Sequence, residues 1–372
     1  MQEKFTELAA SIMNPYVKDW KQQGKPVVGY ICSYVPREVI HAAGILPYRV
    51  GARGCTSTDE ADVWMAAITC SFARCCLELA LQGEYDFLDG LVSMNTCECM
   101  RRMCDNWTHT VGVPYSYYMS VPYKSDAGAI DFFEEELHLF QASMEKHFGA
   151  SITDESLENS IQMSNETRRL LRRLHETRMR KAPPLTGTEI QKIAILSTAM
   201  PAEAYNPLLE AFLEEVDSRE GITGHQARLM VIGSPMDDTR LTETIEEFGG
   251  LIVTDATCYG AYSYWDSIEA AGNPWRSVAS YYLKRPGCPR MPQKSGDRLA
   301  YIGEMAKAFE VDGIIFQRML FCNLWGGETL PLEEGLEEME IPLLVLDREY
   351  IPGAIGQLRT RLQAFIEMIK GV

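Results

Sequence analysis

The sequence predicts an α/β protein made of two parallel-sheet domains joined by a helical segment. Short apolar runs that end in polar residues recur along the chain with helical patterns between them, and this β-α-β order is typical of parallel sheets. Between the two sets of runs, residues 131–180 follow a helical pattern rich in Glu and Arg. A chain of 372 residues is also longer than one ordinary core. The predicted domains are an N-terminal helix (1–24), a first α/β domain (25–125), a helical connector (126–187) and a second α/β domain (188–372).

The first domain opens with an amphipathic helical pattern and then alternates strands with helices. Pro36 suits the first turn of a helix and Gly44 its end, so a helix separates the first two strands. The predicted elements are, in order, a helix at 5–20, strands at 27–32 and 45–50, a helix at 61–82 that contains Cys70, a strand at 87–93 and a helix from Cys97 through Trp107.

The second domain offers five apolar runs of strand length. In open parallel sheets, ligands bind beyond the carboxyl ends of the strands, so the residues after each run are candidate binding positions. The predicted strands are 193–196, 228–233, 250–255, 313–316 and 343–347, and the residues that follow strands include Ser234, Cys258, Cys322 and Arg348.

Composition and charge argue against several classes of function. The hydrophobic fraction of 46% and the charged fraction of 23% are those of a folded chain. A net charge of −17 argues against a nucleic-acid partner, because the one basic cluster, 168–173, lies in a charge-mixed helical segment. No apolar run approaches the ~20 residues that span a bilayer, and the N-terminus lacks the pattern of a signal peptide. We therefore expect a cytoplasmic protein that binds neither membrane nor nucleic acid.

Cysteine usage is the strongest chemical signal. The chain has 11 cysteines, eight of them from Cys32 to Cys104, and the reducing cytoplasm disfavours disulfides. Cys97 starts a predicted helix, where unpaired backbone N–H groups and the helix dipole favour a thiolate that binds iron or acts as a nucleophile. Cys70 and Cys322 could join it across a cleft between the domains. Three thiolates would leave one iron of a [4Fe–4S] cube open; alternatively, all three are reduced core cysteines.

Several motifs occur in order along nearly the whole chain. They are Ile31–Pro47, Cys70–Arg74, Tyr85–Gly90, Thr96–Glu98, Arg285–Met291, Val311–Cys322, Asp347–Tyr350, Gly356–Arg361 and Ala364–Glu367. As an ordered set, these motifs resemble the benzoyl-CoA reductase/2-hydroxyacyl-CoA dehydratase family.

The resemblance implies two flavodoxin-like domains and one [4Fe–4S] cluster held by Cys70, Cys97 and Cys322. It also implies a homologous partner subunit and a separate ATP-hydrolysing iron–sulfur activator that delivers one electron. In the dehydratases, the open iron binds the thioester carbonyl of an acyl-CoA, and a ketyl radical lets the β-proton and the α-hydroxyl leave. One-electron reduction makes this elimination accessible, since the β-proton is otherwise too weakly acidic.

Three further thiols lie near predicted strand ends, and the resemblance gives them an alternative role. In a branch of the family, six cysteines hold a double-cubane [8Fe–9S] cluster in a homodimer that reduces small molecules. Cys32, Cys258 and Cys288 are the candidate extra ligands here, although Cys258 and Cys288 are also found in members that resemble ordinary subunits of the family. The remaining five cysteines are interpreted as packing residues: Cys55, Cys75, Cys76, Cys99 and Cys104.

Substrate contacts and proton transfer are less clearly indicated. Guanidinium groups suit the phosphates of coenzyme A, but each arginine near a motif could equally pair with a neighbouring acid. Glu38, Glu98 and Glu328 lie near candidate ligands without singling out a general base. Besides the single-cluster enzyme and the double-cubane reductase, a third alternative for the function of the whole chain is a cluster-bearing protein without catalytic activity. The candidate arginines are Arg285, Arg290 and Arg318, with Arg348, Arg359 and Arg361 at the end of the chain.

Overall fold

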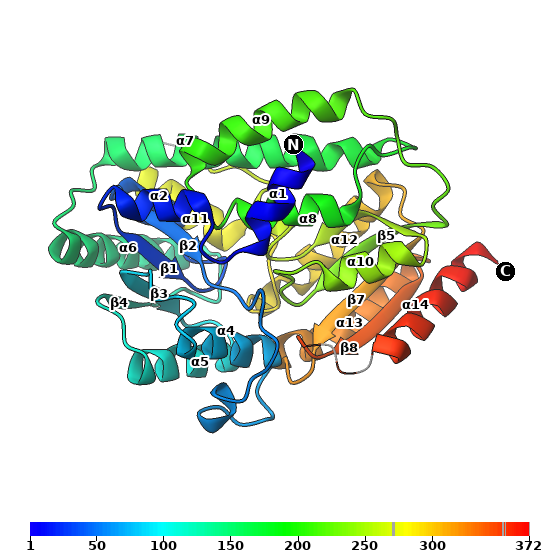
Figure 1. Ribbon diagram of the computed structural model, residues 1–372, viewed down its shortest axis with the longest axis horizontal. Helices are drawn as coiled ribbons and strands as arrows, with labels where there is room; N and C mark the ends of the chain where they lie inside the picture. Colours follow the sequence, from blue (N-terminus) through cyan, green and yellow to red (C-terminus); the bar gives the residue numbers. More distant parts are fainter. Residues whose placement is uncertain (270–271, 352, 354, 372) are drawn as a thin grey trace.

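The computed structural model, which describes residues 1–269, 272–351, 353 and 355–371, contains two four-stranded sheets with helices around them (Figure 1). Every strand pairing in both sheets is parallel. The prediction of an α/β protein with two parallel sheets is therefore confirmed. The strands are β1 Val27–Tyr30, β2 Leu46–Arg49, β3 Gly90–Met94, β4 Ser116–Met119, β5 Ala227–Gly233, β6 Gly250–Ala256, β7 Gly313–Met319 and β8 Leu343–Arg348.

The two sheets share one strand order. The first is β2-β1-β3-β4 and the second is β6-β5-β7-β8, which is the order of the first four strands in flavodoxin-like folds. The order reverses between β1 and β3 in one sheet, and between β5 and β7 in the other. In such folds, ligands bind outside the carboxyl ends of the strands at this reversal.

Helices connect the strands and cover the faces of the sheets. In Figure 1, α7 and α9 lie above the sheets, α4 and α5 below the first sheet, and α14 beyond β8. No helix among the described residues is long and apolar enough to cross a membrane. The helices are α1 Gln2–Ala10, α2 Pro15–Gln22, α3 Arg37–Ala42, α4 Ser71–Leu81, α5 Glu98–Thr110, α6 Ala127–Phe148, α7 Asp154–Glu176, α8 Gly187–Leu196, α9 Ala202–Asp217, α10 Arg240–Glu247, α11 Pro274–Lys284, α12 Ser295–Ala308, α13 Asn323–Glu338 and α14 Ile355–Lys370.

Both cores use segments that are distant in sequence. Phe5 and Leu8 of α1 are buried in the core of the second sheet, and α1 packs against α8. Conversely, Trp275 and Val278 of α11 are buried in the core of the first sheet, and α11 packs against α6. The chain therefore crosses between the two sheets in both directions.

One predicted strand is wrong, because residues 193–196 form the last turn of helix α8. The Thr186 side chain accepts a hydrogen bond from the Glu189 backbone N–H at 3.1 Å, and the Glu189 carboxylate accepts from the Thr186 N–H at 2.6 Å. This reciprocal capping box starts a helix at Gly187, and the helix continues through the apolar run.

Two predicted helices have different limits. Within 61–82, the α-helix begins only at Ser71, so Cys70 caps the helix instead of lying inside it; a short 3-10 turn occupies 61–63. The predicted helix 5–20 is two helices, because the Asn14 side chain accepts from the backbone N–H groups of Tyr16 and Val17 and starts α2 at Pro15.

Candidate functional site

The three thiols predicted to act together occupy equivalent positions on three helices. Cys70 is the N-cap of α4, Cys97 is the N-cap of α5 and Cys322 is the N-cap of α13. Cys97 follows β3 and Cys322 follows β7, so each lies beyond a strand that borders the reversal of strand order. The site therefore combines three helix N-termini with the carboxyl ends of strands from both sheets.

The structure brings these thiols within electrostatic reach of one another. Burial raises the pKa of Cys70 to about 12, and the charge on Cys322 adds to that rise. The pKa of Cys97 is also raised well above its ordinary value, first by burial and then by Cys322, Cys99 and Cys70. The pKa of Cys322 is raised by burial and by Cys99. As bare side chains, these cysteines are therefore neutral thiols at pH 7.

Backbone dipoles oppose the effect of burial at each of these cysteines. The N–H groups of Phe72 and Ala73 lower the pKa of Cys70, and that of Met100 lowers the pKa of Cys97. The Trp325 and Leu324 N–H groups do the same at Cys322. None of the three sulfurs makes a close capping hydrogen bond. The N–H groups in the first turn of each helix consequently remain available to stabilise the cysteine thiolates that form when a bound metal displaces the thiol protons.

Cys99, interpreted from the sequence as a packing residue, packs against the core of the first sheet and also lies near this group. Its charge acts on Cys70, Cys97 and Cys322, and its Sγ lies 3.9 Å from the Phe321 carbonyl oxygen. Phe321 itself has a φ of +64°, a left-handed conformation that is unfavourable for an aromatic residue, directly before Cys322. The Cys97-x-Cys99 spacing was the available signal, because both residues begin the same helix.

Within the described residues, no three His, Cys, Asp or Glu side chains converge closely enough to hold a single metal ion. In an iron–sulfur cube each thiolate binds a different iron, so that donor set is spread around the cofactor instead of meeting at one point.

The three extra thiols form a second group near the first sheet. Cys288 has its pKa raised to about 12 by burial and by Cys32 and Cys258, and Cys32 also raises the pKa of Cys258. The Arg49 guanidinium donates to Cys258 Sγ at 3.1 Å. Cys32, just beyond β1, has a φ of +81°, another strained left-handed position. Cys32, Cys258 and Cys288 are thus neighbours.

The four remaining cysteines are core residues, and two of them lie within electrostatic reach of the candidate ligands: Cys76 of Cys70, and Cys104 of Cys32. They belong to the buried core beside α4 and α5, and each is at most 3% exposed. They are Cys55, Cys75, Cys76 and Cys104.

The candidate phosphate-binding arginines divide into three environments. Arg285 is buried against the rings of Tyr34 and Tyr282 and donates to the Ser33 carbonyl. Arg290 is buried and donates to the Asn95 carbonyl at 3.3 Å and the Asn95 side chain at 3.1 Å, so it fixes the loop before Cys97. Arg318 forms an ion pair with Asp347. In the described structure, none of these three guanidiniums is presented to solvent without a partner.

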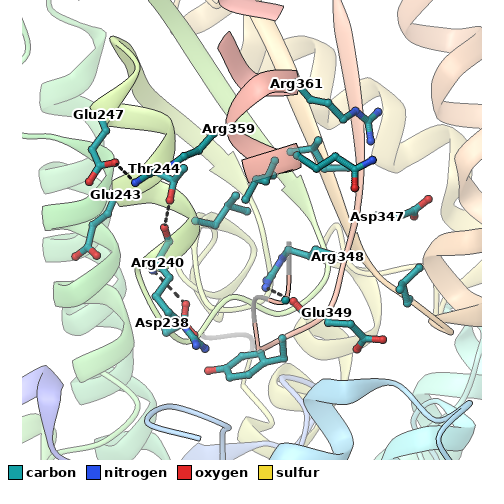
Figure 2. Close-up of a pocket in the computed structure, with 17 residues that line it drawn as sticks. Asp238, Arg240, Glu243, Thr244, Glu247, Asp347, Arg348, Glu349, Arg359 and Arg361 are labelled. Carbon is teal, nitrogen blue, oxygen red and sulfur yellow. Dashed lines mark hydrogen bonds and ion pairs between the residues drawn. The ribbon is translucent and has the colours of Figure 1, made fainter. Parts of the chain in front are cut away.

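A separate pocket of about 710 Å³ is lined by four arginines: the candidates Arg348, Arg359 and Arg361, and also Arg240 (Figure 2). It lies between α10, the end of β8 and α14. Arg240 pairs with Asp238, Arg359 pairs with Glu247 at 3.2 Å, and Arg348 donates to the Gln317 side chain at 2.8 Å. The lining also includes further carboxylates, so the pocket has no excess of positive charge to select phosphate. Its lining residues with ionisable side chains are Asp238, Arg240, Glu243, Glu247, Asp347, Arg348, Glu349, Tyr350, Arg359 and Arg361.

The three candidate glutamates have different surroundings. Glu38 is fully buried and pairs with Arg168, and Glu328 pairs with the buried Arg298 at 2.7 Å. Glu98 is exposed and pairs with Arg102 on its own helix. Two of the three are therefore committed to buried ion pairs, and the structure does not single out a general base.

The fold and the thiol group define an α/β protein of two parallel sheets with a multi-cysteine site where strands and helix N-termini meet. A family model described as "2-hydroxyglutaryl-CoA dehydratase, D-component" matches residues 32–369, and the chain belongs to this family. The resemblance predicted from the ordered motifs is confirmed.

Characterised relatives cover nearly the whole chain. It is 28% identical to the (R)-phenyllactyl-CoA dehydratase beta subunit of Clostridium sporogenes, over 98% of each chain. It is 25% identical to one subunit of the benzoyl-CoA reductase of Thauera aromatica, over 95% of this chain and 94% of the relative. It is 23% identical to the beta subunit of (R)-2-hydroxyglutaryl-CoA dehydratase of Acidaminococcus fermentans, over 99% and 98%. A GTP-binding protein from Sulfolobus solfataricus has a TM-score of only 0.23 to this structure, with 10% identity over 93% of this chain and 99% of that protein.

Proposed function

We propose that this chain is the [4Fe–4S]-bearing subunit of a complex that dehydrates a 2-hydroxyacyl-CoA, or reduces an aromatic acyl-CoA, with Cys70, Cys97 and Cys322 as cluster ligands. The supporting observation is that these three thiols cap three helices and lie within electrostatic reach of one another. Three protein ligands suit a cube that keeps one iron open. The names of the relatives support both a dehydratase and a reductase, and dehydration is the first choice.

The chain's own residues would bind and orient such a cluster. When bound, the cluster would supply one-electron chemistry at an open iron. The first-turn N–H groups of α4, α5 and α13 point their dipoles at the thiolates, which stabilises the charge that metal binding requires. The nearly buried position of Cys70 excludes water from one side.

The proposed partners follow from the relatives, which are subunits of larger enzymes. We propose a homologous subunit beside this chain, an ATP-dependent iron–sulfur activator as the electron donor, and an acyl-CoA as the substrate, all in the cytoplasm. The dehydratase chemistry inferred above, with a ketyl radical on the thioester, belongs to this complex.

Iron and sulfide analysis tests the cluster. Anaerobically reconstituted protein should hold roughly four iron and four sulfide per chain, and Cys97→Ala should lower both strongly. Cys104→Ala, a buried cysteine outside the group, is the matched control and should keep the wild-type count. Wild-type protein without iron, or a Cys97→Ala variant with unchanged iron, would contradict the proposal. If iron is present but no hydroxyacyl- or arenoyl-CoA turns over with activator, reductant and ATP, the non-catalytic alternative gains support.

The neighbouring positions of Cys32, Cys258 and Cys288 support a second candidate, a homodimeric double-cubane reductase. This candidate predicts about eight iron and nine sulfide per chain, half of which should be lost in Cys288→Ala. A count near four that is unaffected by Cys288→Ala favours the single cube.

A further inference from the structure

We propose that Asp237 and Tyr350 form a buried latch that fixes the position of Cys70 relative to Cys322. Both are positioning residues: neither belongs to the thiol group itself. This proposal rests on the proposed function, because the reason to fix the distance between the two thiols is that a multi-iron cofactor needs its ligands at defined distances. The contacts that carry it are independent of any cofactor.

The first part of the latch is the Asp237 carboxylate. Asp237 is 2% exposed, and no Lys or Arg side chain among the described residues forms an ion pair with it. Its Oδ2 accepts hydrogen bonds from the backbone N–H of Ala52 at 2.5 Å and of Arg53 at 3.1 Å. Since a backbone N–H only donates, Oδ2 is an acceptor at both bonds. The loop after β5 is thereby tied to the loop after β2.

A glycine makes this close approach possible. A Cβ at Gly51 would lie 2.2 Å from Asp237 Oδ2, so a larger residue there would push the carboxylate away. The contact between the two loops therefore depends on two residues: Asp237, which provides the carboxylate, and Gly51, which leaves room for it.

The second part of the latch joins Asp237 to the helix that Cys70 caps. The Tyr350 hydroxyl donates to Asp237 Oδ1 at 2.6 Å, and the Tyr350 backbone N–H donates to Ser71 Oγ at 2.8 Å. The Tyr350 ring also packs edge-on against Phe72, with centroids 5.7 Å apart. Ser71 and Phe72 are the first two residues of α4, so Tyr350 determines where the N-terminus of this helix lies.

The same loop after β5 reaches Cys322. Ser234, three residues before Asp237, is fully buried, and its Oγ accepts from the Met319 N–H at 2.9 Å. Its hydroxyl also faces Cys322 and lowers that residue's pKa. One loop, 234–237, therefore holds the Cys70 helix through Tyr350 and the Cys322 loop through Ser234. A shift of this loop would change the separation of two thiols on different sheets.

Thiol bridging in the iron-free protein tests the latch. Dibromobimane links two neighbouring thiols, and peptide mass spectrometry identifies the Cys70–Cys322 product among the 11 cysteines. Tyr350→Phe removes the hydroxyl and keeps the ring, and we expect a several-fold slower Cys70–Cys322 bridge. Asp237→Ala should have a similar effect, whereas Asp237→Asn, which retains an acceptor for the two N–H groups, should restore most of the wild-type rate.

Tyr205→Phe is the matched control. Tyr205 is also buried and donates its hydroxyl to the Ile193 carbonyl at 2.7 Å, but it contacts no residue of the latch. It should lose similar stability without slowing the bridge. Equal slowing in both variants, or an unchanged rate in Tyr350→Phe, would overturn the latch. A latch-dependent bridge in a protein that never binds iron would support the latch and refute the cluster.

Discussion

At the scale of single residues, burial has opposite outcomes for the charge of the buried thiols and of the buried Glu38 carboxylate. Buried thiols are kept neutral, since burial raises the pKa of Cys70 and Cys97. One buried carboxylate, that of Glu38, is instead kept ionised by specific donors. Burial alone would raise the pKa of Glu38, but Arg168, Arg37 and the Tyr282 hydroxyl together lower it to about 2. Glu38 ties α3, α7 and α11 together through these contacts.

Glu38→Gln should destabilise the protein by about 3–5 kcal/mol at pH 7, because Arg168 would remain charged and buried without its partner. The wild-type pair contributes stability above the ordinary Glu pKa of 4.5, and that contribution is lost as the pH falls towards 2. Urea unfolding should therefore show a large difference between wild type and variant at pH 7 and a smaller one at pH 3.

Glu166→Gln is the control for this prediction, since Glu166 pairs with Arg169 on an exposed helix face. It should change the free energy of unfolding by less than about 1 kcal/mol. Equal effects of the two substitutions at pH 7 would show that the Glu38 pair contributes no more than a surface pair.

Single residues also show what sequence reasoning could find at the site. Cys70, Cys97 and Cys322 were identified as a candidate group from the sequence alone, because ordered motifs mark all three and strand ends mark two. Asp237 and Tyr350 were not, since their roles depend on the Ala52 and Ser71 contacts, which join residues 185 and 279 positions apart. Contacts between residues so far apart in sequence cannot be predicted from local patterns and become visible only in the folded structure.

At the scale of elements, local patterns predicted seven of the eight strands, missed β4, and wrongly made a strand of 193–196, where capping decides. The helices before β5, β6, β7 and β8 have no reciprocal cap, whereas residues 193–196 are preceded by Thr186 and Glu189. An apolar run of four residues fits a strand or one buried helical turn equally well. The cap seven residues earlier determines the outcome, and it was visible in the sequence as Thr-x-x-Glu.

Thr186→Ala tests this explanation. Removing the Thr186 hydroxyl leaves the Glu189 N–H without its acceptor, and we expect a loss of about 1 kcal/mol in the free energy of unfolding. Amide hydrogen exchange in the first turn of α8 should become faster. Thr108→Ala, which removes an exposed mid-helix hydroxyl bonded to the Cys104 carbonyl, is the control and should stay within about 0.5 kcal/mol. Unchanged exchange in α8 would mean that packing alone sets the start of the helix.

At the scale of the whole molecule, the sequence predicted two sheets but not which helices pack on each sheet. The N-terminal helix α1 lies in the core of the second sheet, and α11, far along the chain, lies in the core of the first. Amphipathic patterns say that α1 and α11 must be covered, but not by which sheet. Each sheet is thus completed by a segment from the other half of the chain, which favours cooperative unfolding of the whole.

Phe5→Ala tests this cooperativity. Phe5 is 1% exposed and packs against Phe212 with ring centroids 5.2 Å apart, so its removal should cost about 3–5 kcal/mol. If the two sheets unfold together, hydrogen exchange of the slowest amides should accelerate equally in β5 and β7, which share a buried core with Phe5, and in β1 and β3, which do not. Phe132→Ala, at a side chain that is 49% exposed, should accelerate neither. Acceleration confined to β5 and β7 would show instead that the second sheet opens independently, despite the segments that cross between the cores.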